Sequence, residues 1–289
     1  MNESARRGYL SENYRLFHIA DARSSVHRFH FHDFDKIVIP LSGNVTYIME
    51  GKTYLLRKDD ILLVPHHAVH QSVIRDEAPY ERIVLWVNSS FLASQKEADL
   101  GSLFALAKDS RLCLLRLGPE QQGLFTRLLR QLEEALTSKD FAAGLMADTL
   151  FLQLMIYLNR WTLSQSPEDA ALCRQDIRYD ARIESILRYI EAHLSQELSA
   201  ESLADRFFIS KSHLMHRFRE QTGCTLHRYI RQKRLLYARD LLMHRVPVTE
   251  ACMACGFQDY SAFLRAFKSM FRCLPSEIYE VSAGSEPLE

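Results

Sequence analysis

The spacing of apolar positions along the chain changes from one stretch to the next. From about His27 to Leu92, short apolar runs alternate with turn residues, which is typical of strands in an all-β unit. The predicted strands are Lys36–Leu41, Val45–Met49, Thr53–Leu56, Ile61–Val64 and Tyr80–Val87, and turns are expected at Ser42–Asn44, Glu50–Lys52 and Asp59–Asp60. Short strands at this spacing predict a sandwich or a small barrel.

Helical periodicity follows this β unit. After Gly118–Pro119, one stripe carries Leu124, Leu128, Leu129, Leu132 and Leu136, and a second apolar helix is predicted over Ala142–Trp161. Two apolar helices in this position either cap the core of the β unit or pair with a second subunit.

A linker is expected where the periodicity is lost. The segment 164–180 is polar and contains Pro167, so it separates an N-terminal domain (1–163) from a C-terminal domain (181–283). The C-terminal domain opens with an amphipathic helix over Arg182–His193.

The last hundred residues contain two copies of one pattern, in which a short apolar helix and a tight turn precede a helix with a polar, basic face. In the first copy (Ser199–Gly223), Ser199 and Ser210 are predicted N-caps and Gly223 a C-cap. Residues three, four and seven apart share one side of a helix, and the strip predicted to face outward contains Ser212, Met215, His216 and Arg219. Such a strip is what a recognition helix presents to the major groove of DNA.

The second copy (Val248–Phe271) repeats this arrangement. Thr249 is the predicted cap of its first helix, Gly256 supplies the turn and Asp259 caps the recognition helix. The residues expected to face outward are Tyr260, Ser261, Leu264, Arg265 and Lys268. Arg265 is the first candidate for a base contact, because guanidinium pairs with guanine through two hydrogen bonds, and Lys268 is a phosphate candidate.

A single long helix, Thr225–Met243, is predicted to join the two copies and to hold them at a fixed separation. Its Arg and Lys residues contribute to a basic C-terminal block: the range Ala181–Val281 has fifteen Lys/Arg against eleven Asp/Glu, although the whole chain has a net charge of zero. A modest basic excess suits a surface that binds phosphate.

This half resembles the AraC/XylS family of bacterial transcription regulators. The matching positions include Leu203–Ala204, Ser210, Leu214, Phe218, Gly223, Arg234, Ala238, Leu241–Leu242, Val248, Ala251, Gly256–Phe257, Phe263, Arg265, Phe267–Lys268 and Pro275–Ser276. The resemblance implies that both recognition helices enter successive major-groove segments of double-stranded DNA. It places base-reading positions at Ser212, Met215 and His216 and then at Tyr260, Ser261, Leu264 and Arg265. It also implies a homodimer, RNA polymerase as a partner, activation of transcription, and control by a sugar or related metabolite.

The N-terminal half resembles the cupin barrel that such regulators often carry. The residues that match its two short motifs are His30, His32, Lys36, Gly43, Asp60, Pro65, His67 and His70. In metal-binding cupins, two histidines, a glutamate and a later histidine surround one ion. Here Lys36 stands in place of the glutamate, and its ammonium group would oppose a cation.

The preferred interpretation is therefore a small-molecule effector pocket without a metal or cofactor. Its expected lining is His30, His32, Lys36, Tyr47, His70 and Trp86. If Lys36 points inward, an anionic or hydroxyl-rich ligand is favoured. Two alternatives remain open, namely a metal-dependent cupin enzyme fused to a DNA-binding domain, and a ligand-independent regulator that uses the barrel only to dimerise.

Composition and motifs narrow the remaining classes. No apolar run is long enough to span a membrane, and the first residues lack the apolar core of a signal peptide. The six cysteines form no disulfide framework, and Cys252 and Cys255, a CxxC pair, are expected to be buried thiols. Phosphate-binding loops and hydrolase motifs are absent from the sequence. We therefore expect a cytoplasmic α+β regulator and not an enzyme.

Overall fold

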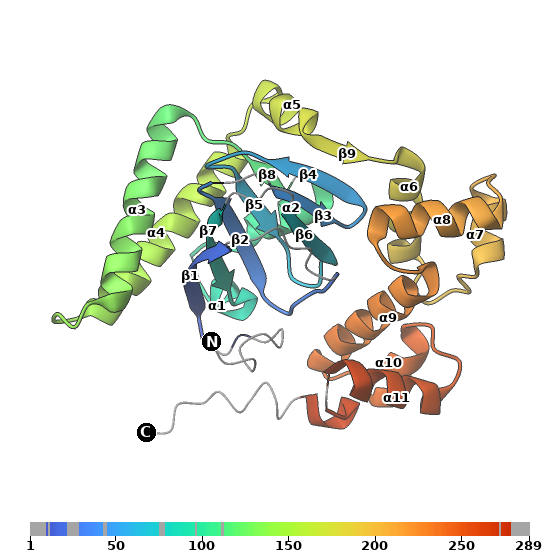
Figure 1. The fold of residues 1–289 in the computed structure, drawn as a ribbon. Helices are drawn as coiled ribbons and strands as arrows, with labels where there is room; N and C mark the ends of the chain where they lie inside the picture. Colours follow the sequence, from blue (N-terminus) through green and yellow to red (C-terminus); the bar gives the residue numbers. More distant parts are fainter. Residues whose placement is uncertain are drawn as a thin grey trace. The chain divides into compact units, whose positions relative to one another are not determined.

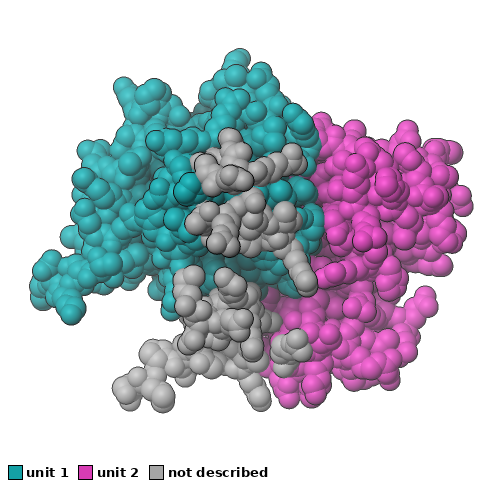
Figure 2. All heavy atoms as spheres, in the orientation of Figure 1, with its two compact units in different colours: residues 1–49, 53–178 teal, residues 50–52, 179–289 magenta. Residues whose placement is uncertain are grey.

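The computed structural model describes residues 10, 12–21, 29–42, 45–74, 79–95, 97–110, 113–271 and 273–278. The chain forms two compact units, one of residues 1–49 and 53–178 and the other of residues 50–52 and 179–289 (Figure 2). The first unit is built on β-sheets with added helices and the second is helical (Figure 1), so the predicted α+β class is confirmed. None of the described helices combines the length and apolarity that crossing a bilayer requires.

Two antiparallel sheets form the centre of the first unit. One has the order β1-β7-β2-β5-β8 and the other β6-β3-β4-β9. The strands are β1 (Tyr14–Asp21), β2 (Asp35–Pro40), β3 (Val45–Met49), β4 (Lys52–Leu56), β5 (Ile61–Val64), β6 (His70–Ile74), β7 (Tyr80–Val87), β8 (Leu114–Leu115) and β9 (Ile177–Tyr179). Buried side chains from both sheets belong to one hydrophobic core.

The five predicted strands are all present, but four others were missed. Strand β1 pairs with β7 and strand β6 pairs with β3, so neither partner is adjacent in the sequence. Strands β8 and β9 are only two and three residues long. Pairing of this kind depends on partners outside the local sequence window. Gly43 and Asn44 of the predicted turn, His27 at the start of the β unit and the residues after Ile278 lie outside the described residues.

Four described helices of the first unit follow β7 before residue 164. They are α1 (Ser89–Ala93), α2 (Ser102–Ser110), α3 (Pro119–Thr137) and α4 (Ala143–Leu163), of which α1 and α2 were not predicted. The predicted stripe of α3 is buried at Leu128, Leu129 and Leu132, whereas Leu136 is exposed. Tyr14 of β1 stacks on Phe151 of α4 with ring centroids 4.0 Å apart. The pair α3–α4 therefore covers the core of the β unit.

Regular structure also occupies the segment 164–180, where we expected a linker. It contains α5 (Pro167–Gln175) and β9, and the division between the two units falls after residue 178. Pro167, which indicated a break in periodicity, is the first residue of α5, where its missing amide hydrogen costs nothing.

An ion-pair network ties this segment to the sheets. Arg116 donates to both carboxylate oxygens of buried Asp60, at 2.7 and 3.0 Å, and to Asp176 at 2.7 Å. Asp176, in turn, is the C-cap of α5, and its carbonyl accepts a hydrogen bond from Leu55 of β4.

The second unit consists of short helices around one longer helix. They are α6 (Ala181–Ala192), α7 (Ala200–Arg206), α8 (Lys211–Thr222), α9 (Leu226–Met243), α10 (Val248–Ala254), α11 (Tyr260–Phe271) and the short 3-10 helix η2 (Pro275–Glu277). The helix predicted over Thr225–Met243 is α9, with the Thr225 side chain capping its first turn. This order of helices confirms the predicted C-terminal architecture.

Candidate nucleic-acid interface and effector site

Helices α7 and α8 form the first helix-turn-helix motif. The hydroxyl of Ser199 accepts a hydrogen bond from the amide of Ser202, and that of Ser210 accepts one from the amide of His213, so both predicted N-caps are confirmed. Gly223 ends α8 with φ at 71°, a left-handed conformation that glycine adopts without steric cost. Ser210 and Gly223 therefore mark the two ends of α8, and Ser199 marks the start of α7.

The predicted outward strip of α8 lies on the surface of the second unit. Ser212, His216 and Arg219 are exposed and Met215 is half-buried. Leu214 and Phe218 on the other side of the helix are fully buried, and Phe218 packs edge-on against a ring of α9. The strip offers hydroxyl, imidazole and guanidinium groups beside one thioether, which is the mixture that base edges and phosphates require.

Arg217 of α8 has a structural role. Its guanidinium donates to Asp180 at 2.9 Å and to Glu220 at 2.7 Å. Asp180 is also the N-cap of α6, because its carboxylate accepts from the amides of Arg182 and Ile183. The arginine therefore fastens α8 to the start of α6.

Helices α10 and α11 form the second motif. Gly256 supplies the turn with φ at 84°, and Asp259 caps α11 by accepting from the amides of Ser261 and Ala262. The prediction that Thr249 caps α10 is wrong, because the helix already begins at Val248 and Pro247 takes the cap position.

The outward face of α11 also matches the prediction. Tyr260, Ser261, Arg265 and Lys268 are exposed, and Leu264 is half-buried. Within the described residues, neither Arg265 nor Lys268 forms an ion pair. Both cations are therefore available to an anionic partner.

Arg234 of α9 connects the segment between α6 and α7 to the turn of the second motif. It donates to the carbonyls of Leu194 at 2.9 Å and Gln196 at 2.5 Å. Its guanidinium also lies against Gly256, where an added Cβ would come within 3.0 Å of Arg234 and 2.3 Å of the Leu194 oxygen. Arg234 is therefore a packing residue of the second unit.

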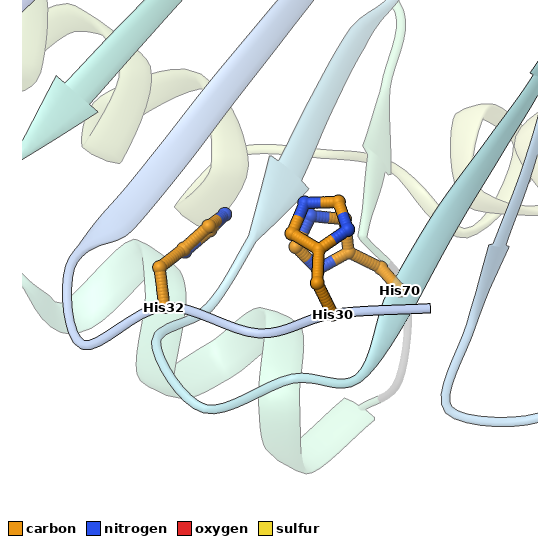
Figure 3. A group of neighbouring side chains, drawn as sticks. All are labelled: His30, His32 and His70. Atoms are coloured by element: carbon orange, nitrogen blue, oxygen red, sulfur yellow. The ribbon is translucent and has the colours of Figure 1, made fainter. Parts of the chain in front are cut away.

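In the first unit, three histidines predicted for the effector pocket come together. The ring centroids of His30 and His70 are 4.3 Å apart and those of His32 and His70 are 4.7 Å apart (Figure 3). The backbones of His30 and His70 form an antiparallel bridge with hydrogen bonds of 3.0 and 2.9 Å. His32 and His70 are buried, whereas His30 is exposed. This set of three imidazoles could hold a metal ion.

Backbone carbonyls fix the orientation of the two buried rings. Nδ1 of His32 lies 3.0 Å from the Phe34 oxygen, and Nδ1 of His70 lies 2.9 Å from the Ala68 oxygen. Because a carbonyl only accepts, each ring carries its proton on Nδ1 and leaves a lone pair on Nε2. Burial is the main cause that lowers the pKa of both histidines well below 6.5, and the Lys36 charge adds to it. Both rings are therefore neutral.

Lys36 is buried beside these rings. Its side chain therefore points inward, which is the condition under which the sequence favours an anionic or hydroxyl-rich ligand. Its Nζ lies 3.0 Å from Nε2 of His70 and 5.8 Å from the centre of the Tyr47 ring. Burial lowers the pKa of Lys36 from 10.5 to about 7, with a further contribution from the charge of Arg82. No carboxylate pairs with Lys36 among the described residues.

The two aromatic residues predicted as walls of the pocket differ in position. Tyr47 is buried with its ring 6.3 Å from His70, at the cluster. Trp86 pairs with Lys36 in the register of β2 and β7 and packs against Phe34 at 4.5 Å. A buried cation that was not predicted, Arg82, lies on the same face of β7 as Trp86, four residues away. The period-two pattern of β7 was the signal that could have found it.

The two cysteines of the CxxC pair have a structural role. Cys252 and Cys255 are buried, as predicted, and burial raises the pKa of the Cys255 thiol to about 12. A thiol of that pKa is inert near neutral pH.

Comparison with known proteins supports the interpretation of both halves of the chain, since a protein-family profile matches each of them. A profile described as an AraC-like ligand binding domain matches residues 14–155, and one described as a helix-turn-helix domain matches residues 203–280. The HTH-type transcriptional activator RhaS of Citrobacter koseri is 28% identical over 251 residues, covering 86% of each chain, and that of Escherichia coli SMS-3-5 is 27% identical over 257 residues, covering 88% of each. The structure of ToxT from Vibrio cholerae aligns over 93% of this chain and 98% of its own, at 13% identity and a TM-score of 0.35. The chain thus belongs to the AraC family of DNA-binding transcriptional regulators and carries the ligand-binding domain of that family at its N-terminal end.

Proposed function

We propose that the protein is a cytoplasmic activator that reads its operator with α8 and α11. The residues assigned to DNA contact are Ser212, Met215, His216 and Arg219 of α8 and Tyr260, Ser261, Leu264, Arg265 and Lys268 of α11. Seven of these nine side chains are exposed and two are half-buried, on helices that are capped at the first turn and buried on the other side, which supports this assignment. The similarity to proteins named as transcriptional activators supports the direction of regulation, which would also require contact with RNA polymerase.

The observation that carries the DNA-contact proposal is Arg265, an exposed guanidinium on the open face of α11 without an ion pair in the described part of the chain. The test is selection of bound genomic fragments by the purified full chain, repeated with Arg265→Ala. We expect a motif of two half-sites about 10 base pairs apart, and a loss of about 1 to 3 kcal/mol at one base position in the variant.

Two controls make the result specific. Lys268→Ala should weaken binding to every sequence alike and reduce the salt dependence, because a phosphate contact carries no sequence information. Arg130→Ala, which removes an exposed arginine of α3, should leave selection unchanged. Unchanged selection by the Arg265 variant would show that this residue does not read bases.

We further propose that a small-molecule effector binds in the first unit, among His30, His32, Lys36, Tyr47, His70 and Trp86. Support comes from the buried polar groups that this set places in an otherwise apolar core. An effector acts by binding one functional state better than another. The test is a thermal-shift screen of metabolites, since a bound ligand must raise the melting temperature, and a true hit should lose its effect in Tyr47→Ala.

We also propose that the protein acts as a homodimer, because two copies would contact a longer operator than one. The helix pair α3–α4 leaves Leu136, Phe141, Leu145 and Met146 exposed near its connecting turn. Light scattering of the purified chain measures the mass directly, and Leu145→Glu would test this surface.

A further inference from the structure

Nitrogen atoms of His30, His32 and His70 converge on one point of the first unit. One ligand-capable nitrogen from each ring lies within 4.8 Å of the others, and Figure 3 shows the outer nitrogen of His32 turned toward the other two rings. A bound zinc ion holds imidazole nitrogens at about 2.0 to 2.1 Å, so nitrogens of one site lie within about 4 Å of each other. Side-chain shifts of about one ångström would close the cluster around an ion.

The two buried rings are already oriented as metal ligands are. Each donates its Nδ1 proton to a backbone carbonyl, of Phe34 for His32 and of Ala68 for His70. Histidines that bind metals are usually held in this way by a second hydrogen bond, which fixes the tautomer and directs the other nitrogen at the ion. Both Nε2 lone pairs are therefore directed at the cluster.

His32 supplies the second, independent observation. Its side chain is 5% exposed, and its Nε2 atom has no hydrogen-bond partner within the described residues. A buried acceptor that remains unsatisfied destabilises the fold, because it has lost its hydrogen bonds to water. His70 differs, because Lys36 lies 3.0 Å from its Nε2. The lone pair on Nε2 of His32 is therefore buried without a hydrogen-bond donor or a metal ion among the described residues.

We propose that His30, His32 and His70 form a binding site for one divalent transition-metal ion of the zinc type. Three neutral imidazoles suit zinc and its neighbours, whereas magnesium and calcium require oxygen ligands. The ion would satisfy His32 and draw His30, on the exposed side, into the set. The proposal concerns the ion alone and does not depend on the effector or on DNA binding.

Lys36 sets the strength of this site. Its amine must leave Nε2 of His70 for an ion to bind there, and the four-carbon side chain has the rotatable bonds to do so. A positive charge beside the ion opposes binding, because like charges repel strongly at the effective dielectric of proteins. Lys36→Met should therefore raise the affinity for zinc by at least about tenfold, which corresponds to 1.4 kcal/mol.

The test uses the full chain after treatment with a chelator. Zinc binding is measured by competition with a chromogenic chelator, and cobalt binding by the visible absorption of a four-coordinate ion. We expect one ion per chain, a loss of affinity of at least tenfold in His32→Ala and in His70→Ala, and tighter binding in Lys36→Met. His30→Ala tests the same site at an exposed position, where folding is least affected. His18→Ala, at an exposed histidine of β1, is the matched control.

Two results would overturn the proposal. Binding that appears only in Lys36→Met would show that the Lys36 amine takes the place of an ion in the native protein. Binding that survives the His30, His32 and His70 substitutions would show an adventitious surface site, since the chain has 12 histidines in all. Circular dichroism of each variant confirms that the fold is retained.

Discussion

Replacing Lys36 with methionine should stabilise the first unit, because the change removes a buried amine and keeps the length of the side chain. Lys36 is 7% exposed, and burial lowers its pKa from 10.5 to about 7. Each pKa unit corresponds to 1.36 kcal/mol, so folding near neutral pH costs roughly 4 kcal/mol at this residue. Methionine avoids that cost but leaves Nε2 of His70 without its donor, which costs about 1 to 3 kcal/mol. We expect a net gain of about 1 to 3 kcal/mol at pH 7.

The same shift predicts how the difference depends on pH. Between pH 7 and 10.5 the unfolded chain holds a proton on Lys36 that the folded chain has lost, so the wild-type free energy of unfolding rises with pH through this window. The cost is complete below pH 7 and has disappeared above 10.5. The stability of Lys36→Met relative to wild type should therefore fall by about 3 kcal/mol between pH 7 and 9.5.

Tryptophan fluorescence is a suitable assay, since both tryptophans of the chain, Trp86 and Trp161, belong to the first unit. Urea denaturation at pH 7 and pH 9.5 gives the two differences in the free energy of unfolding. Lys58→Met, at an exposed lysine, should change stability by less than about 0.5 kcal/mol at either pH. The reasoning is refuted if Lys36→Met is destabilising at pH 7 and its difference from wild type is the same at both pH values.

Three further substitutions test other features. Asp60→Asn should cost about 2 to 4 kcal/mol in thermal unfolding, because it removes the buried carboxylate that pairs with half-buried Arg116. Glu134→Gln on the surface of α3 should cost under about 0.5 kcal/mol, and equal effects of the two changes would contradict the burial argument. Gly256→Ala should cost more than about 2 kcal/mol and abolish DNA binding, since its Cβ would lie 2.3 Å from a carbonyl, while Gly123→Ala in the open interior of α3 should be neutral or stabilising. Ser210→Ala should reduce stability by about 1 kcal/mol, as measured by circular dichroism, through loss of the N-cap of α8, and no change would show that the cap is dispensable.

Local signals in the sequence were sufficient for most of the second unit. Ser199, Ser210 and Asp259 cap their helices as predicted, and Gly223 and Gly256 take the left-handed conformations expected of them. These features depend on a few neighbouring residues, which is why a single sequence can reveal them.

The first unit was predicted less completely because its pairing is non-local. Strand β1 pairs with β7, more than fifty residues later in the chain, and no pattern within β1 specifies that partner. In the same way, the resemblance to cupin motifs brought His30, His32 and His70 to attention, but only the folded chain shows which nitrogen of each buried ring faces the cluster. The cationic neighbour Arg82 was missed although it lies on the same face of β7 as Trp86, where the period-two pattern of the strand could have revealed it.

The junction between the units has a practical consequence for dividing the protein. Strand β9 ends at Tyr179, and the next residue, Asp180, already caps α6, so the chain has almost no spare length there. A fragment that ended at residue 163 would lose β9 and also Asp176, one of the two carboxylates that hold Arg116. Chimaeras that exchange sensor domains between regulators of this kind should therefore be joined at Asp180, where one residue separates two complete elements.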